Sequence, residues 1–309
     1  MQSYTRLARL TVVLIFSFIS ISGIQAAEKK HQFGPWVWGF SGGAVHQFDA
    51  DLSDMDGQFN VSRGFVQASL GYAWDRNTSV SLSFGAGSSN YDFSPGATIA
   101  GQAPWEKIED YRISLPIRFA PTERSSVILI PSVKTFKESG ASLTAGRTEG
   151  FIGGISWKLS ETLTIGPGMG WFSEVGGGSN AFPIVVVDWK ITDKLSLSTG
   201  RGLAASQGPG LTLDYQLAKK WKLGLSGRYE RIRFALNEDA LGAGDVGEDR
   251  SLPLIVSLDY SPWPMTSITA IFGVEFEGRL RLEDEQGRRI AQSNFDTAPV
   301  IGLSFSSRF

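Results

Sequence analysis

The chain has 309 residues, a formal net charge of −2, no cysteine, 36 glycines and 12% aromatic residues. A nearly neutral chain gives no electrostatic reason to expect nucleic acid or another polyanion as a partner. The lack of cysteine excludes a disulfide framework and a lipid attached through cysteine. High glycine and aromatic content is typical of β-barrels, in which glycine occupies crowded walls and aromatic rings form girdles.

The first 26 residues have the pattern of a secretory signal peptide. Arg6 and Arg9 give a positive start, an apolar stretch runs from Leu10 to Ile19, and Ala26 ends a loose cleavage context. The apolar stretch is shorter than the ~20 residues that a spanning helix needs, so a membrane anchor is the weaker interpretation. We therefore expect a signal peptide at 1–26 and a single mature domain at 27–309.

The mature chain repeats one pattern six times: an alternating run reaches an aromatic residue, passes through a few polar residues, and begins to alternate again. No later segment is long enough for a membrane-spanning helix, and a period of two indicates strands. Each repeat predicts a short hairpin turn beside an aromatic residue at a membrane interface. The predicted girdle comprises Trp74, Phe119, Trp157, Trp189, Tyr215 and Tyr260.

Longer polar connections alternate with these short turns. They cover approximately 47–60, 92–108, 137–147, 174–181, 203–209, 237–250 and 283–296. Six short turns and seven longer loops require about fourteen strands, with both chain ends on the side of the short turns. The sequence therefore predicts an all-β fold, a single antiparallel transmembrane β-barrel with about 14 strands, and leaves 12 to 16 open.

The alternation also predicts which polar side chains point into the barrel, where water or a partner can meet a charge. The predicted lumen charges are Arg112, Arg118, Lys222, Arg228, Glu275, Glu277, Arg279, Arg281, Asp188, Asp214 and Asp259. They favour either a constriction with a transverse field or a salt-bridge network that makes the barrel rigid. The three aspartates precede girdle aromatics, which suits hydrogen bonding near the turns or a vestibule that attracts cations.

Catalysis is not expected. The sequence has two histidines, His31 and His46, and neither belongs to an Asp-x-His or His-x-Ser pattern that would place a base beside a nucleophile. The aspartate-rich stretch 49–57 has the carboxylate density of a calcium loop but lacks its full spacing, so a solvated surface loop is the preferred interpretation. We expect no metal and no cofactor.

The last strand carries the most specific signal. Phe309, Phe305, Leu303 and Ile301 share one face of the stretch 298–309, and mostly small polar residues occupy the other. In this the chain resembles bacterial outer-membrane β-barrel proteins, whose last strand typically closes the barrel and ends in Phe. Ser307 departs from the aromatic or apolar residue that the resemblance expects there. The resemblance implies integral outer-membrane localisation, contact with membrane lipid, and recognition of this strand by the barrel-assembly machinery.

Barrel size sets the functional expectation. The interior of an eight-stranded barrel is filled by its own side chains, and a sixteen-stranded barrel encloses an aqueous channel. A barrel of about fourteen strands therefore suits a narrow lumen. We expect a narrow passive channel for small hydrophilic solutes or ions. A non-conducting structural or surface-interaction barrel is the alternative, and a transporter of hydrophobic substrates is the third hypothesis, because one fold class hosts many functions.

Overall fold

The computed structural model describes residues 35–54, 56–98, 103–199, 210–237, 246–284 and 286–309. The predicted signal peptide (1–26) and His31 lie outside these residues. In the described ranges, no helix has the length and apolar character needed to cross a bilayer.

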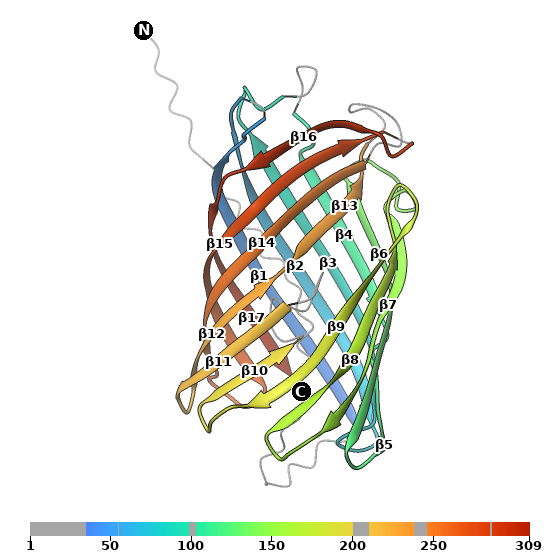
Figure 1. Cartoon of the computed structure of the whole chain (residues 1–309), viewed down its shortest axis with the longest axis vertical. Coiled ribbons are helices and arrows are strands. Elements are labelled where there is room, and N and C mark those ends of the chain that lie inside the picture. Colours follow the sequence, from blue (N-terminus) through green and yellow to red (C-terminus); the bar gives the residue numbers. More distant parts are fainter. Residues whose placement is uncertain (1–34, 55, 99–102, 200–209, 238–245, 285) are drawn as a thin grey trace.

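Seventeen strands in the described residues form one sheet that closes on itself as a barrel (Figure 1). The strands are β1 (Trp36–Asp51), β2 (Gln58–Ala73), β3 (Ser79–Phe93), β4 (Lys107–Ser114), β5 (Ile117–Thr122), β6 (Ser125–Glu138), β7 (Arg147–Lys158), β8 (Leu163–Ser173), β9 (Ser179–Lys190), β10 (Leu195–Thr199), β11 (Gly210–Ala218), β12 (Trp221–Arg228), β13 (Glu230–Ala235), β14 (Val246–Tyr260), β15 (Thr266–Glu283), β16 (Arg289–Phe295) and β17 (Ala298–Arg308).

These strands fill 14 positions around the barrel. Three positions hold two consecutive strands each, because β4 and β5 both pair with β3, β12 and β13 both pair with β14, and β16 and β17 both pair with β15. Neighbouring positions are antiparallel throughout. The predicted all-β antiparallel barrel of about fourteen strands is confirmed.

The first and last strands close the barrel. β1 pairs with β17 from Gly39↔Arg308 to Gln47↔Val300. The backbone N–H of Phe309 donates to the carbonyl of Trp38 (2.8 Å), and the N–H of Trp38 donates to the carbonyl of Phe309 (3.0 Å). The final residue is therefore part of the ladder, and this pairing leaves no free edge between the two strands.

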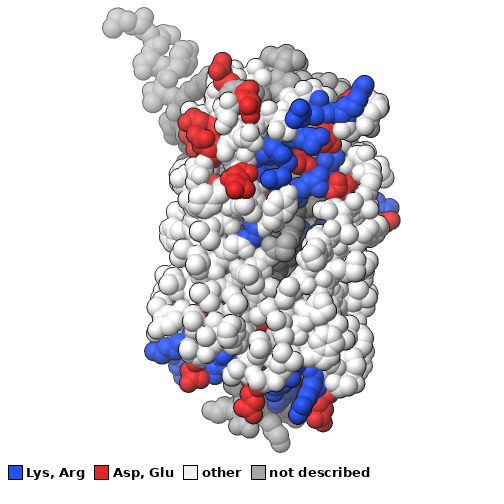
Figure 2. Space-filling model, in the orientation of Figure 1, with Lys and Arg blue, Asp and Glu red and all other residues white. Residues whose placement is uncertain are grey.

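The barrel wall is apolar on the outside. Figure 2 shows a wide band almost free of charge across the visible face, with Lys, Arg, Asp and Glu gathered above and below it. Large hydrophobic side chains along the strands, such as Phe84, Ile113 and Leu225, are exposed. A closed barrel satisfies every backbone hydrogen bond internally, which lipid demands of any spanning structure. The chain is an integral β-barrel of the bacterial outer-membrane type.

The short turns and the chain's last residue lie at the lower end of the barrel in Figure 1. Five of the six predicted girdle aromatics, Trp74, Phe119, Trp157, Trp189 and Tyr215, are exposed there or near it. The sixth, Tyr260, is half-buried because its ring packs on Trp221 at a centroid distance of 4.7 Å.

The upper end of the wall departs from a simple barrel. β13, residues 246–251 of β14, residues 279–283 of β15 and β16 form what we call the inward-bent sheet. The bend follows a register shift between Arg250 and Leu252, opposite Glu277, whose φ of 48° marks a bulge. It carries β13 across the lumen until Ala235 pairs in parallel with Lys137 of β6 on the other wall.

One face of the inward-bent sheet packs on the inner side of β2, β3, β4 and β6, and the contact forms the main hydrophobic core. The buried members are Ala50, Leu52, Phe59, Val61, Tyr91, Ala97, Trp105, Ile108, Phe136, Phe234, Leu236, Leu280, Leu282, Phe295 and Ala298. Their side chains fill the space between the inward-bent sheet and β2, β3, β4 and β6 in the upper mouth of the barrel. The predicted loop at 283–296 is correspondingly wrong over Arg289–Phe295, which form β16 and pair with β15.

Candidate functional site

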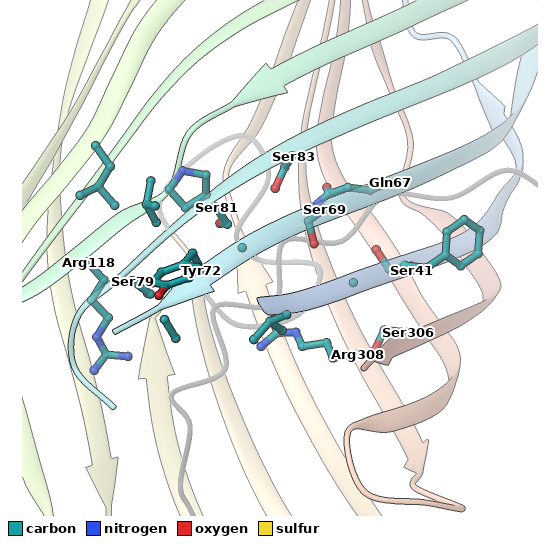
Figure 3. A pocket seen from close by; sticks show the side chains of 18 of the residues that line it. Ser41, Gln67, Ser69, Tyr72, Ser79, Ser81, Ser83, Arg118, Ser306 and Arg308 are labelled. Atoms are coloured by element: carbon teal, nitrogen blue, oxygen red, sulfur yellow. The ribbon is translucent and has the colours of Figure 1, made fainter. Parts of the chain in front are cut away.

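The lower lumen contains a small cavity of about 190 Å³. It lies between β1, β2, β3, β5 and β17, and serines, arginines and apolar residues line it together (Figure 3). The serines are Ser41, Ser69, Ser79, Ser81, Ser83, Ser306 and Ser307. Ser79, Ser81 and Ser83 share one side of β3, while Leu82 and Phe84 on its other side are exposed. A hydroxyl can donate and accept, so this surface can solvate either sign of charge.

Arginines supply the charge of this lower cavity. Arg76, Arg118 and Arg308 line it together with Tyr72. Figure 3 shows Arg118 and Arg308 on different sides of the same space. Arg118 is one of the predicted lumen charges. Arg308 and the serines were missed, although the alternation that placed Arg118 inward could have identified the serines.

Two of the predicted aspartates meet a predicted lysine on adjacent strands. Lys222 Nζ lies 3.3 Å from Asp214 and 3.6 Å from Asp259, and the hydroxyl of Thr269 donates to Asp259. The third, Asp188, lies on β9 opposite Ser198 of β10. The first two therefore belong to one cross-strand network with Lys222.

The main buried charge cluster links the inward-bent sheet to the opposite wall. Arg63 of β2 donates to Asp249 of β14 (2.9 Å) and to Glu275 of β15 (3.0 Å). The hydroxyl of Tyr91 also donates to Asp249, at 2.7 Å. Gln47 accepts from both terminal nitrogens of Arg63, at 3.3 Å each. Glu275 was predicted to face the lumen; Arg63 and Asp249 were missed, and only the bend brings them together.

The remaining predicted charges lie higher on the wall. Arg228 pairs with Glu230 at 2.6 Å, where β12 passes into β13. Arg112 of β4 stands directly opposite Lys134 of β6 in the ladder. The prediction assumed unbroken alternation through residue 281, but the bulge at Glu277 interrupts it. Glu277 is exposed, and Arg279 and Arg281 shift to the other side of β15.

That shift creates a second, larger cavity of about 460 Å³, which we call the wall cavity. One side is the lumen-facing surface of β6, β7, β8 and β9. The other side is the charged face of the inward-bent sheet, with Tyr229, Arg231, Arg233, Glu248, Arg250, Arg279 and Arg281. Leu254 and Val256 face lipid on β14, so the alternation gives Glu248 and Arg250 the same side of that strand. Lower on β14 this side of the strand faces lipid; above the bend the same side, with Glu248 and Arg250, faces the inner surface of the opposite wall.

Part of the charge in the wall cavity is already paired. Arg231 contacts Glu174 (2.5 Å) and Glu248 (2.9 Å), and Arg233 contacts Glu248 (3.1 Å). Arg233 also reaches Glu283 at 2.7 Å, and Arg281 reaches the same residue at 2.7 Å. These contacts join the β8–β9 connection to the inward-bent sheet.

A histidine–serine pair does occur on the wall. His46 Nδ1 and Ser62 Oγ lie 2.9 Å apart on the paired strands β1 and β2. Nucleophilic catalysis also needs a group that orients the imidazole and a site for the oxyanion. In the described ranges His46 has no carboxylate partner, so the pair does not amount to a triad. No group of three or more metal-ligating side chains occurs among the described residues.

Comparisons with known proteins find similarity in architecture. No protein-family model and no curated protein matches the sequence. An outer-membrane channel from Pseudomonas putida F1 superposes with a TM-score of 0.49 at 8% identity, over 89% of this chain and 96% of that one. A FadL homologue from Pseudomonas aeruginosa gives 0.45 at 13% identity, over 89% of both chains. The KdgM porin gives 0.33 at 9% identity, over 86% of this chain and 98% of that one.

Proposed function

We propose that this protein is a gated outer-membrane channel for small hydrophilic solutes. The observation that carries the proposal is the lower cavity, in which serines and arginines line an interior space inside a wall that is apolar on the outside. Polar interior surface at the depth of the membrane is tolerated where water or a solute meets it. Its small volume suits small solutes rather than chains.

The inward-bent sheet is the gate in this proposal. Its apolar face fills the upper mouth, so a solute passes only when the sheet moves away from β2, β3 and β4. The sheet is held by its apolar core, by the Arg63 cluster, by the ion pair of Arg231 with Glu174, and by the bridge from Ala235 to Lys137.

A reversible crosslink tests the gate. The chain has no cysteine, so Ala235→Cys with Lys137→Cys would introduce a single pair at bridged positions. Directly opposite residues in a sheet lie at separations that a disulfide can span. The variant would be refolded and studied in planar bilayers before and after reduction, with each single cysteine variant as a control.

We expect conductance steps from the native protein, loss of those steps on oxidation of the double variant, and recovery on reduction. If the folded protein shows no conductance steps in either redox state, the result would favour the non-conducting structural barrel. The packed apolar mouth is the observation that supports that alternative. Equal conductance in both states would keep the channel and refute the gate.

A further inference from the structure

The wall cavity has a strong excess of positive charge. Six cationic side chains line it: Lys134, Arg231, Arg233, Arg250, Arg279 and Arg281. Two carboxylates, Glu174 and Glu248, share the lining, and both are bound to Arg231 or Arg233. Figure 2 shows basic side chains, with fewer acidic ones among them, gathered at the upper end of the visible face.

Two of these cations have no carboxylate within ion-pair distance among the described residues. Lys134 Nζ lies 4.1 Å from the ring centroid of Phe172, and the guanidinium carbon of Arg250 lies 5.4 Å from the ring centroid of Tyr229. Arg279 reaches its carboxylate, Glu248, only at 3.8 Å. A cation over an aromatic face keeps most of its hydrogen-bonding capacity, because the ring occupies one side only. These groups are therefore available to an anion.

The opposite side of the wall cavity carries, beside Lys134 and a few polar side chains, aromatic rings that pack over glycines. Phe172 and Phe182 line it with Ile152. A Cβ on Gly150 would lie 2.6 Å from the ring of Phe172, and a Cβ on Gly170 would lie 2.3 Å from the ring of Phe182. Because Gly150 and Gly170 have no side chain, both rings can lie against the neighbouring strands. The cavity consequently has an aromatic floor and cationic groups around it.

We propose that the wall cavity binds a small amphipathic anion, a carboxylate carried on an aromatic ring. The carboxylate would accept hydrogen bonds from Lys134 and Arg250, and the ring would pack against Phe172 and Phe182. Charge-assisted hydrogen bonds fix the head group, and apolar burial adds affinity. This binding goes beyond the proposed channel function, because it requires no passage through the lumen.

The size of the cavity favours a free solute over a membrane lipid. Small-molecule sites fall in the range of about 300–1,000 Å³, and the wall cavity, at about 460 Å³, accommodates a one- or two-ring molecule. An anionic lipid carries the same kind of charge, but its several acyl chains would not fit in a cavity of this size. The test below separates the two sources.

Isothermal titration of benzoate into folded, detergent-solubilised native protein tests the proposal. Benzyl alcohol, benzylamine and acetate serve as the neutral, cationic and ring-free comparisons. The informative variant is Lys134→Gln with Arg250→Gln, which leaves the ion pairs of Arg231 and Arg233 intact. Its matched control is Arg124→Gln with Lys158→Gln, which removes two exposed charges at the lower turns.

We expect saturable binding of benzoate in preference to the three comparison compounds. In the double variant we expect binding about tenfold weaker or more, because each charge-assisted hydrogen bond is lost. The control variant should bind as the native protein does. Equal binding of benzoate and benzylamine, or unchanged binding in the double variant, would overturn the proposal, and so would binding of lipopolysaccharide that benzoate does not displace. A protein that binds benzoate but never conducts would refute the channel and leave this site in place.

Discussion

The Arg63 cluster offers the sharpest test of how the upper mouth is held shut. Replacing Arg63 by Met keeps an unbranched apolar stem and removes the guanidinium with its charge. Asp249 and Glu275 then remain buried without their cation, with side chains 3% and 6% exposed. Removing one partner of a buried ion pair costs roughly 3–5 kcal/mol. Since the Arg63 side chain is itself 18% exposed, we take the lower end.

A loss of about 3 kcal/mol corresponds to about a hundredfold larger population of the opened sheet, because every 1.4 kcal/mol is about tenfold. Amide hydrogen exchange measures this population through amides that bond between the inward-bent sheet and the wall. The N–H of Ser53 donates to the carbonyl of Asn294 in β16 (2.9 Å). We expect exchange at Ser53 to rise by about that factor in Arg63→Met, while amides of the lower wall keep their protection. Arg118→Met in the lower cavity is the matched control, because it removes an arginine that does not touch the sheet.

The rescue variant separates charge from packing. Adding Asp249→Asn and Glu275→Gln to Arg63→Met removes the two unpaired charges and retains the shape of the cluster. We expect this triple variant to recover most of the lost protection. The reasoning fails if Arg63→Met exchanges no faster than the Arg118→Met control. It fails equally if amide exchange in the triple variant is as fast as in Arg63→Met.

Three further predictions concern other contacts. Trp105→Ala should destabilise the packed mouth by about 3–5 kcal/mol, because it empties a buried ring site; chemical denaturation would measure the loss. Phe309→Ala should reduce assembly into the outer membrane, because it removes the exposed aromatic ring at the end of the last strand; the fraction of heat-modifiable folded barrel in the membrane would show it. The N–H of Asn77 donates to Asp75 in the lower turn at 2.6 Å and lowers the pKa of that carboxyl. Its stabilisation is present at neutral pH and lost as pH falls through the lowered pKa, so the difference in melting temperature between native protein and Asp75→Ala should shrink on acidification.

The sequence alone determined the architecture of the wall. Period-two alternation is a local property, since each residue's side of a strand follows from its neighbour's. Short turns and girdle aromatics such as Trp74 and Trp157 recur at every hairpin, so their count predicted the strand number. The pairing of β17 with β1 agrees with the resemblance carried by the last strand.

The tertiary structure decided what happens inside the barrel. A bulge adds one residue to a strand, and Gly278 beside Glu277 permits one there, but glycine is too frequent in these strands to show which position shifts the register. That shift reassigns Arg279 and Arg281 to the wall cavity and brings Asp249 to Arg63. Contacts between strands far apart in the sequence, such as Ala235 with Lys137, depend on which walls approach one another. Alternation specifies the two faces of each strand, but only the path of the sheet through space decides what each face meets.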